Sequence, residues 1–111
     1  MTRITTHVLD TSQGKPAAGI RVRLDRVEKS GSEELARAET DSEGRVRDWV
    51  QTPLAAGRYR IVFETGPWFR ASGRETLYPE IVIHIDVSDS EPHYHVPLLL
   101  APFGYSTYRG S

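Results

Sequence analysis

The chain has 111 residues, a formal net charge of −1 and no cysteine, and its hydrophobic and charged fractions, 38% and 26%, are typical of a globular protein. This length suits one core, so we expect a single domain over residues 1–111. The weak charge and scattered basic residues argue against nucleic-acid or anionic-membrane partners, and the lack of cysteine excludes disulfides, thiol nucleophiles and the common structural zinc sites.

The beginning of the chain bears on where the protein works. Residues 1–6 contain no apolar stretch of the kind found in signal peptides, and no apolar run of 18 residues occurs anywhere. We therefore expect a soluble, cytoplasmic protein with no membrane partner.

The first half of the chain alternates apolar and polar residues with a period of two, which predicts β-strands. In residues 20–27 the apolar side chains Ile20, Val22 and Leu24 fall on one face, so that face should be buried and the other wet. Glycine and polar residues between the runs indicate loops or turns. The expected order is a strand at 4–9, a loop at 10–19, a strand at 20–27, a hairpin loop at 28–33, a strand at 35–40 and a turn at 41–44.

The second half continues the pattern with one interruption. We expect a short helix at 66–76, a turn at 88–92 and strands at 57–64, 80–87, 93–100 and 105–109. Seven or eight short strands with one helical turn are typical of an antiparallel β-sandwich.

Histidines on the predicted strands are the first candidates for chemistry. His93 and His95 are two residues apart and therefore point to the same side of one strand, and His7 shares its side of the first strand with Thr5 and Leu9. If these strands are neighbours, one sheet face carries two or three imidazoles that exchange protons near neutral pH. A strand histidine is more often structural, and we interpret His84 in that way.

A metal or cofactor finds less support in the sequence. His93 and His95 have the spacing of two ligands from one strand, but no cysteine is present and no acidic residue stands at a useful spacing. We therefore expect no native metal site and no cofactor. The motifs of serine nucleophiles, phosphate-binding loops and dinucleotide turns do not occur, which disfavours nucleophilic serine chemistry, phosphoryl transfer and hydride transfer.

The end of the chain is unusually rich in recognition groups. Tyr108 offers a ring and a hydroxyl, Arg109 a planar fork of five donors, and Gly110 a backbone that approaches a ligand closely, with the Ser111 carboxylate next to it. A guanidinium suits a planar, carbonyl-rich heterocycle that carries or develops negative charge. Arg45, in contrast, has a structural interpretation as a charged residue directly after a turn.

Several motifs together resemble one family over nearly the whole chain. They are Ile4-Thr5-Thr6-His7-Val8-Leu9-Asp10 with Gly14-Lys15-Pro16-Ala17, Thr40-Asp41 with Gly44-Arg45, Gly57-Arg58-Tyr59, Tyr78-Pro79-Glu80-Ile81, and the segments 93–100 and 104–111. This set is similar to the 5-hydroxyisourate hydrolases, the transthyretin-related enzymes of urate breakdown. The resemblance implies an all-β, transthyretin-like (prealbumin-like) antiparallel sandwich of two four-stranded sheets with one short helix. It also implies a homotetramer, a dimer of dimers, with the sites at the dimer-dimer interface.

The resemblance further implies hydrolysis of 5-hydroxyisourate, a small molecule, to 2-oxo-4-hydroxy-4-carboxy-5-ureidoimidazoline. It assigns catalysis to His7, Arg45 and His95, and substrate binding to His7, Arg45, Tyr108, Arg109, Gly110 and Ser111. One histidine of the pair would be the general base, the other would orient the water or donate a proton, Arg45 would stabilise the oxyanion, and the tail would close the site.

A carrier of small ligands without turnover is the alternative, because transthyretin shares the fold. The carrier lacks the terminal Tyr-Arg-Gly-Ser, has lysine in place of His7 and has an acidic residue in place of Arg45. This sequence agrees with the enzyme at each of these positions.

Overall fold

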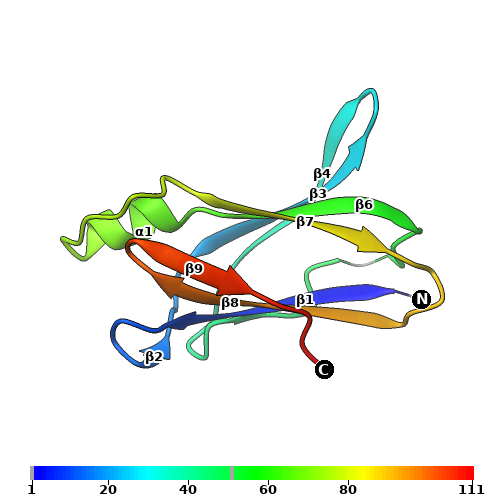
Figure 1. The fold of residues 1–111 in the computed structure, drawn as a ribbon. Helices are drawn as coiled ribbons and strands as arrows, with labels where there is room; N and C mark the ends of the chain where they lie inside the picture. The colour runs from blue at the N-terminus through cyan, green and yellow to red at the C-terminus, as the bar shows by residue number, and fades with distance from the viewer. Residues whose placement is uncertain (1, 51) are drawn as a thin grey trace.

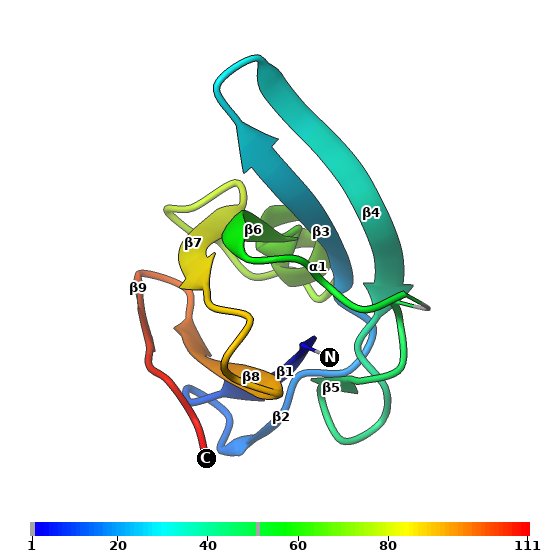
Figure 2. The ribbon, with the colours of Figure 1, turned by 90° about the vertical axis from the view of Figure 1, so that its right-hand side faces the viewer.

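The computed structural model describes residues 2–50 and 52–111, which form two packed β-sheets with one helix at one end (Figures 1 and 2). The first sheet has the order β2 (Lys15–Pro16), β1 (Arg3–Asp10), β8 (His93–Ala101), β9 (Gly104–Thr107), and β5 (Arg45–Val46) pairs with β1. The second has the order β4 (Gly31–Glu39), β3 (Arg21–Glu28), β6 (Gly57–Phe63), β7 (Ile81–Val87). The helix α1 (Thr65–Ala71) connects β6 with β7.

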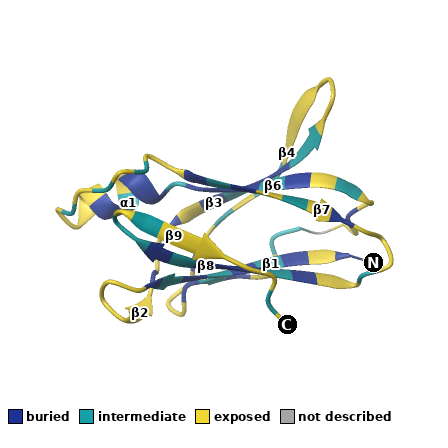
Figure 3. Ribbon diagram, viewed as in Figure 1, coloured by how far each residue is buried: buried dark blue, intermediate teal, exposed yellow. Residues whose placement is uncertain are grey.

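The core lies between the sheets because each central strand turns alternate side chains inward. Figure 3 colours the buried residues dark blue. On β1 the buried positions are Ile4, Thr6, Val8 and Asp10, whereas the residues between them are half-buried or exposed. Further buried members of the core come from both sheets and the helix: Val22, Leu24, Tyr59, Ile61, Phe63, Phe69, Ile81, Ile83, Tyr94, Val96, Leu98 and Leu100. The alternation predicted for residues 4–9 is confirmed, and Thr5, His7 and Leu9 face away from the core.

The predicted sandwich of two four-stranded sheets with one short helix is confirmed, and the structure differs from it in three details. β1 and β8 run parallel, whereas the other strand pairs described are antiparallel. The two-residue strand β5 adds a fifth member to the first sheet, and the two-residue strand β2 lies within the segment 10–19 that we expected to be entirely loop.

The helix is shorter than the predicted 66–76, because it ends at Ala71. Gly73 has φ = 73°, and its N–H donates to Arg70 O while the N–H of Arg74 donates to Phe69 O. These two bonds form a Schellman motif, which satisfies the last carbonyls and stops the helix. No helix in the described residues is long and apolar enough to span a membrane.

The expected hairpin loop at 28–33 is wrong, because β4 already begins at Gly31. The β3–β4 hairpin projects beyond the body of the sandwich (Figures 1 and 2). Backbone pairing continues through the polar residues, with Arg26 opposite Glu33 and Val27 opposite Ser32. Ladder hydrogen bonds need no apolar side chain, so polarity alone does not mark the end of a strand.

The last strand also differs from its predicted bounds of 105–109, since β9 ends at Thr107. Beyond it, the chain keeps only an isolated bridge between Gly110 and His95. That bridge continues the β8–β9 register, in which Leu98 lies opposite Thr107, so the tail stays beside β8.

Candidate active site

The site is built on the outer face of the first sheet, where β1 lies between β8 and β5. In the parallel β1–β8 pair, Thr5 is opposite His95 and His7 is opposite Pro97. On the other edge of β1, His7 is opposite Arg45. Opposed residues on neighbouring strands share a face, so three chain segments far apart in sequence bring His7, His95 and Arg45 together. The neighbouring strands that the histidine hypothesis required are confirmed.

Arg45 is held in place by the turn before it. The Asp41 carboxylate accepts the backbone N–H groups of Arg45 and Glu43, each at 2.9 Å, and these bonds hold the pKa of Asp41 below its usual value. Gly44 has φ = 78° and passes so close to the Val8 carbonyl that a Cβ atom would not fit. The backbone therefore fixes Arg45 beside His7.

Arg45 keeps a donor free for a further partner. Its Nε atom is buried and has no hydrogen-bond acceptor among the described residues. A buried N–H without an acceptor carries a desolvation penalty, which an anionic or carbonyl ligand would relieve. A purely structural arginine would normally have this atom satisfied.

His95 is half-buried, and its surroundings favour the neutral ring. Burial lowers its pKa first, and the coulombic influence of His93, His7 and Arg45 lowers it further. The imidazole is therefore unprotonated at neutral pH and available to accept a proton. These three neighbours lie on three different strands, β8, β1 and β5, so the histidine is surrounded by titratable or cationic side chains from each side.

Thr5 links the two histidines of β8, a contact that sequence reasoning did not assign to the site. Its Oγ1 lies 2.8 Å from His95 Nδ1 and 2.8 Å from His93 Nε2. The prediction that His93 and His95 point to the same side is confirmed, and their ring centroids are 6.3 Å apart. The period-two pattern already placed Thr5 beside His7, but its partners depend on the strand register.

Gly110 brings the tail against His95. Its N–H donates to the His95 carbonyl oxygen at 2.7 Å. A Cβ atom on Gly110 would lie 2.5 Å from His95 Cδ2 and 3.2 Å from Pro97 Cγ. The glycine is needed here because real Cβ atoms do not approach other atoms so closely.

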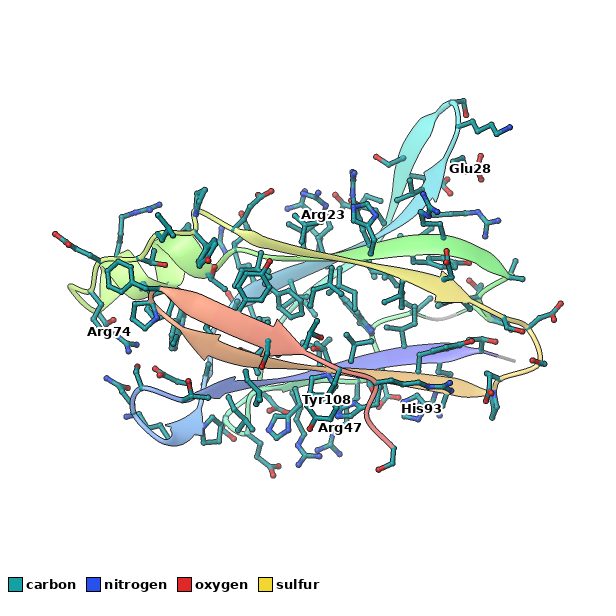
Figure 4. All side chains as sticks on the ribbon, in the orientation of Figure 1. Arg23, Glu28, Arg47, Arg74, His93 and Tyr108 are labelled. Carbon is teal, nitrogen blue, oxygen red and sulfur yellow. The ribbon has the colours of Figure 1, made fainter. Side chains whose placement is uncertain are left out.

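Tyr108 and Arg109 point to opposite sides of the tail. Tyr108 is exposed and lies with His93 and Arg47 on the outer side of the first sheet (Figure 4). The Arg109 guanidinium lies 4.7 Å from the ring centroid of Tyr94, an inward-facing residue, and 3.4 Å from a Glu91 carboxylate oxygen. The structure thus does not bring Arg109 to His7, Arg45 and His95, and its role in substrate binding stays a prediction.

Ser111, which we predicted to bind substrate, and His84, which we interpreted as structural, are both at the surface. Ser111 is exposed, and its role in binding also stays a prediction. His84 is exposed on β7, opposite Arg60 in the second sheet. Within residues 2–50 and 52–111, no three histidine or acidic side chains gather in a way that would hold a metal ion.

The outer face thus combines two imidazoles, a guanidinium whose buried Nε has no acceptor in the described part of the chain, and a glycine-containing tail, on a two-sheet sandwich. The model described as the HIUase/Transthyretin family matches residues 4–110, so the chain belongs to this family.

Named relatives cover the chain from end to end. The 5-hydroxyisourate hydrolase of Caulobacter vibrioides is 46% identical, with 100% of both chains covered. The solved structure of Klebsiella pneumoniae 5-hydroxyisourate hydrolase matches with a TM-score of 0.91 at 44% identity, again over 100% of both chains. Transthyretin from Sparus aurata has the same TM-score of 0.91 over 97% of this chain and 96% of its own, but at 24% identity this likeness concerns the fold alone.

Proposed function

We propose that the protein hydrolyses 5-hydroxyisourate to 2-oxo-4-hydroxy-4-carboxy-5-ureidoimidazoline in urate degradation. The observation that carries this proposal is the grouping of His7, Arg45 and His95 on one sheet face, with Gly110 against His95. Sequence identities of 44% and 46% to proteins named 5-hydroxyisourate hydrolase, over their full length, support the same reaction.

The reaction opens a ring at an amide bond by addition of water. His95 acts as the general base. Burial lowers its pKa, and the ring is therefore neutral at neutral pH. His7, two residues along β1 from Thr5, orients the water or donates a proton of its own to the leaving ring nitrogen. A base positioned in this way contributes about 10²–10⁴ in rate.

Arg45 stabilises the negative charge that develops on the attacked carbonyl oxygen. Its buried Nε–H, which has no acceptor within the described part of the chain, is an oriented donor for that oxygen. Tyr108, Gly110 and Ser111 form the wall of the site contributed by the tail. Arg109 lies on the other side of the tail, where its contact with Tyr94 holds the tail in position.

The site face is open in the single chain, and a second copy would close it. Leu9 and Leu99 are opposed on β1 and β8, both half-buried, on the same face as His7 and His95. We propose a homotetramer, a dimer of dimers, in which this face packs against another copy and the substrate lies between them. Loss of activity on dilution, in parallel with dissociation seen by light scattering, would support this arrangement, and a fully active monomer would contradict it.

The ultraviolet decay of freshly generated 5-hydroxyisourate tests the reaction. With protein at a hundredth of the substrate concentration, we expect decay much faster than in buffer, with many turnovers per subunit. Binding of one substrate or aromatic ligand per site without faster decay would instead indicate a carrier of the transthyretin type and would contradict the proposal.

A further inference from the structure

The His95 side chain has one hydrogen-bond partner in the described chain, and that partner is Thr5. Thr5 Oγ1 lies 2.8 Å from His95 Nδ1 on one side and 2.8 Å from His93 Nε2 on the other. The contact fixes the ring, since Nδ1 faces Thr5 and Nε2 is left without a partner among the described residues. Thr5 and His95 are directly opposed in the β1–β8 register, so the backbone itself sets this pairing.

The chemistry of the Thr5 hydroxyl and the two imidazoles limits which group donates and which accepts each hydrogen bond. A threonine hydroxyl has one hydrogen to donate and two lone pairs, and a neutral imidazole has one N–H and one bare nitrogen. A His95 ring that accepts a proton at Nε2 must carry its own hydrogen on Nδ1. That hydrogen then points at Thr5 Oγ1, and the hydroxyl hydrogen is free to point at the bare Nε2 of His93.

We propose that Thr5 and His93 are positioning residues that hold His95 in the tautomer with a bare Nε2. In this arrangement His95 Nδ1–H donates to Thr5 Oγ1, and Thr5 Oγ1–H donates to His93 Nε2. The inference rests on the proposed function, in which His95 is the base. It extends that function by assigning the orienting role, filled in many active sites by a carboxylate, to a neutral hydroxyl and a second histidine.

The same chain stabilises the charge that appears during reaction. When water loses a proton to His95 Nε2, the ring becomes a cation while keeping its Nδ1–H bond to Thr5. The Thr5 oxygen is then the acceptor of a charge-assisted hydrogen bond, and its own hydrogen bond to His93 polarises it further. The proton taken from water stays on His95, so Thr5 and His93 act through His95 and transfer no proton themselves.

Two variants of Thr5 separate this role from packing. Thr5→Val removes the hydroxyl while keeping the branched shape, and we expect kcat to fall about 10- to 100-fold with KM within about twofold of the wild type, as for loss of a hydrogen bond to a charged group. Thr5→Ser keeps the hydroxyl, and we expect kcat within about threefold of the wild type. A Thr5→Val variant with wild-type kcat, or equal losses in both variants, would overturn the proposal.

A second pair tests His93, which is exposed and therefore tolerant of change. His93→Gln keeps an acceptor for the Thr5 hydroxyl, and His93→Leu removes it. We expect kcat near wild type for the first and about threefold to tenfold lower for the second. Equal activity of the two variants contradicts the part assigned to His93.

Nitrogen-15 NMR of the histidine rings in the free protein tests the tautomer without any substrate. We expect a protonated Nδ1 and a bare Nε2 on neutral His95, and a shift of the Nδ1 signal in Thr5→Val. A neutral His95 protonated at Nε2 would overturn the inference while leaving the hydrolase proposal intact. Absence of turnover in the wild type with the expected tautomer would instead remove the hydrolase proposal and leave the hydrogen-bond arrangement standing.

Discussion

Replacing Gly110 with alanine adds one methyl group at the point where the tail touches His95. The new Cβ atom would lie 2.5 Å from His95 Cδ2, whereas carbon atoms in contact prefer about 3.5–4.0 Å. The ring or the tail must therefore move by about 1 Å. Cδ2 is bonded to Nε2, so a movement of the ring displaces the proposed base directly.

A displacement of about 1 Å at a reacting group costs about a hundredfold in rate, so we expect kcat of Gly110→Ala to fall by about that factor. Stability should change little, by about 1 kcal/mol or less, because Gly110 lies outside the strands and contributes one backbone hydrogen bond to the tail. The assays are decay of 5-hydroxyisourate for kcat and urea unfolding for stability.

Gly104→Ala is the matched control, since a Cβ atom there has no neighbour within 4 Å. It should keep both the activity and the stability of the wild type. If Gly110→Ala is as active as Gly104→Ala, the close contact between tail and His95 has no part in catalysis and the reasoning from geometry is refuted.

Three further predictions concern charge, the tail and the turn before Arg45. By NMR titration His95 should have a pKa below 6.5, and this pKa should move upward in His93→Gln because the coulombic influence of His93 is lost. Stability should accordingly fall as pH drops through about 6.5, where the unfolded chain takes up a proton first, and a pKa above 6.5 would contradict this. Arg109→Ala should lower kcat/KM about tenfold by releasing the tail from Tyr94. Glu91→Gln should change kcat/KM less than threefold because the ion pair between Arg109 and Glu91 is exposed, and equal effects of the two variants would assign the anchoring of the tail to this ion pair instead. Gly44→Ala should lower the free energy of unfolding, measured by urea denaturation, by about 2 kcal/mol or more, whereas Gly14→Ala, at a similar φ but with open space around it, should lower it by about 1 kcal/mol. Equal losses in the two variants would show that the close contact with the Val8 carbonyl does not matter.

The sequence was sufficient to predict which side of its strand each histidine of the site occupies, although Asp25, on the face of residues 20–27 that we expected to be wet, is buried. Alternation alone placed Thr5, His7 and Leu9 together and His93 with His95, because the side-chain period of a strand is fixed by its backbone geometry. It did not determine that β1 and β8 are parallel neighbours, since strand order and register depend on contacts between distant segments. The hydrogen bonds of Thr5 therefore became visible only in the structure.

Two predictions made from local sequence features are wrong, namely the hairpin loop at 28–33 and the end of the helix at residue 76. The polar run around Glu33 resembles a loop, but its backbone continues the ladder of a projecting hairpin. Gly73 supplies the positive φ that ends the helix at Ala71, and a glycine at this place in the sequence is itself a signal for the end of a helix. Tyr108 and Arg109 are adjacent in an extended tail and so face opposite sides, and the part of Arg109 in substrate binding stays a prediction.

The most direct test of the account compares the wild type with a variant in which both His7 and His95 are alanine. Decay of 5-hydroxyisourate should be fast with the wild type and no faster than in buffer with the folded double variant, since both imidazoles that exchange protons at the site are gone. A double variant that retains the wild-type rate would show that the chemistry takes place elsewhere on the molecule.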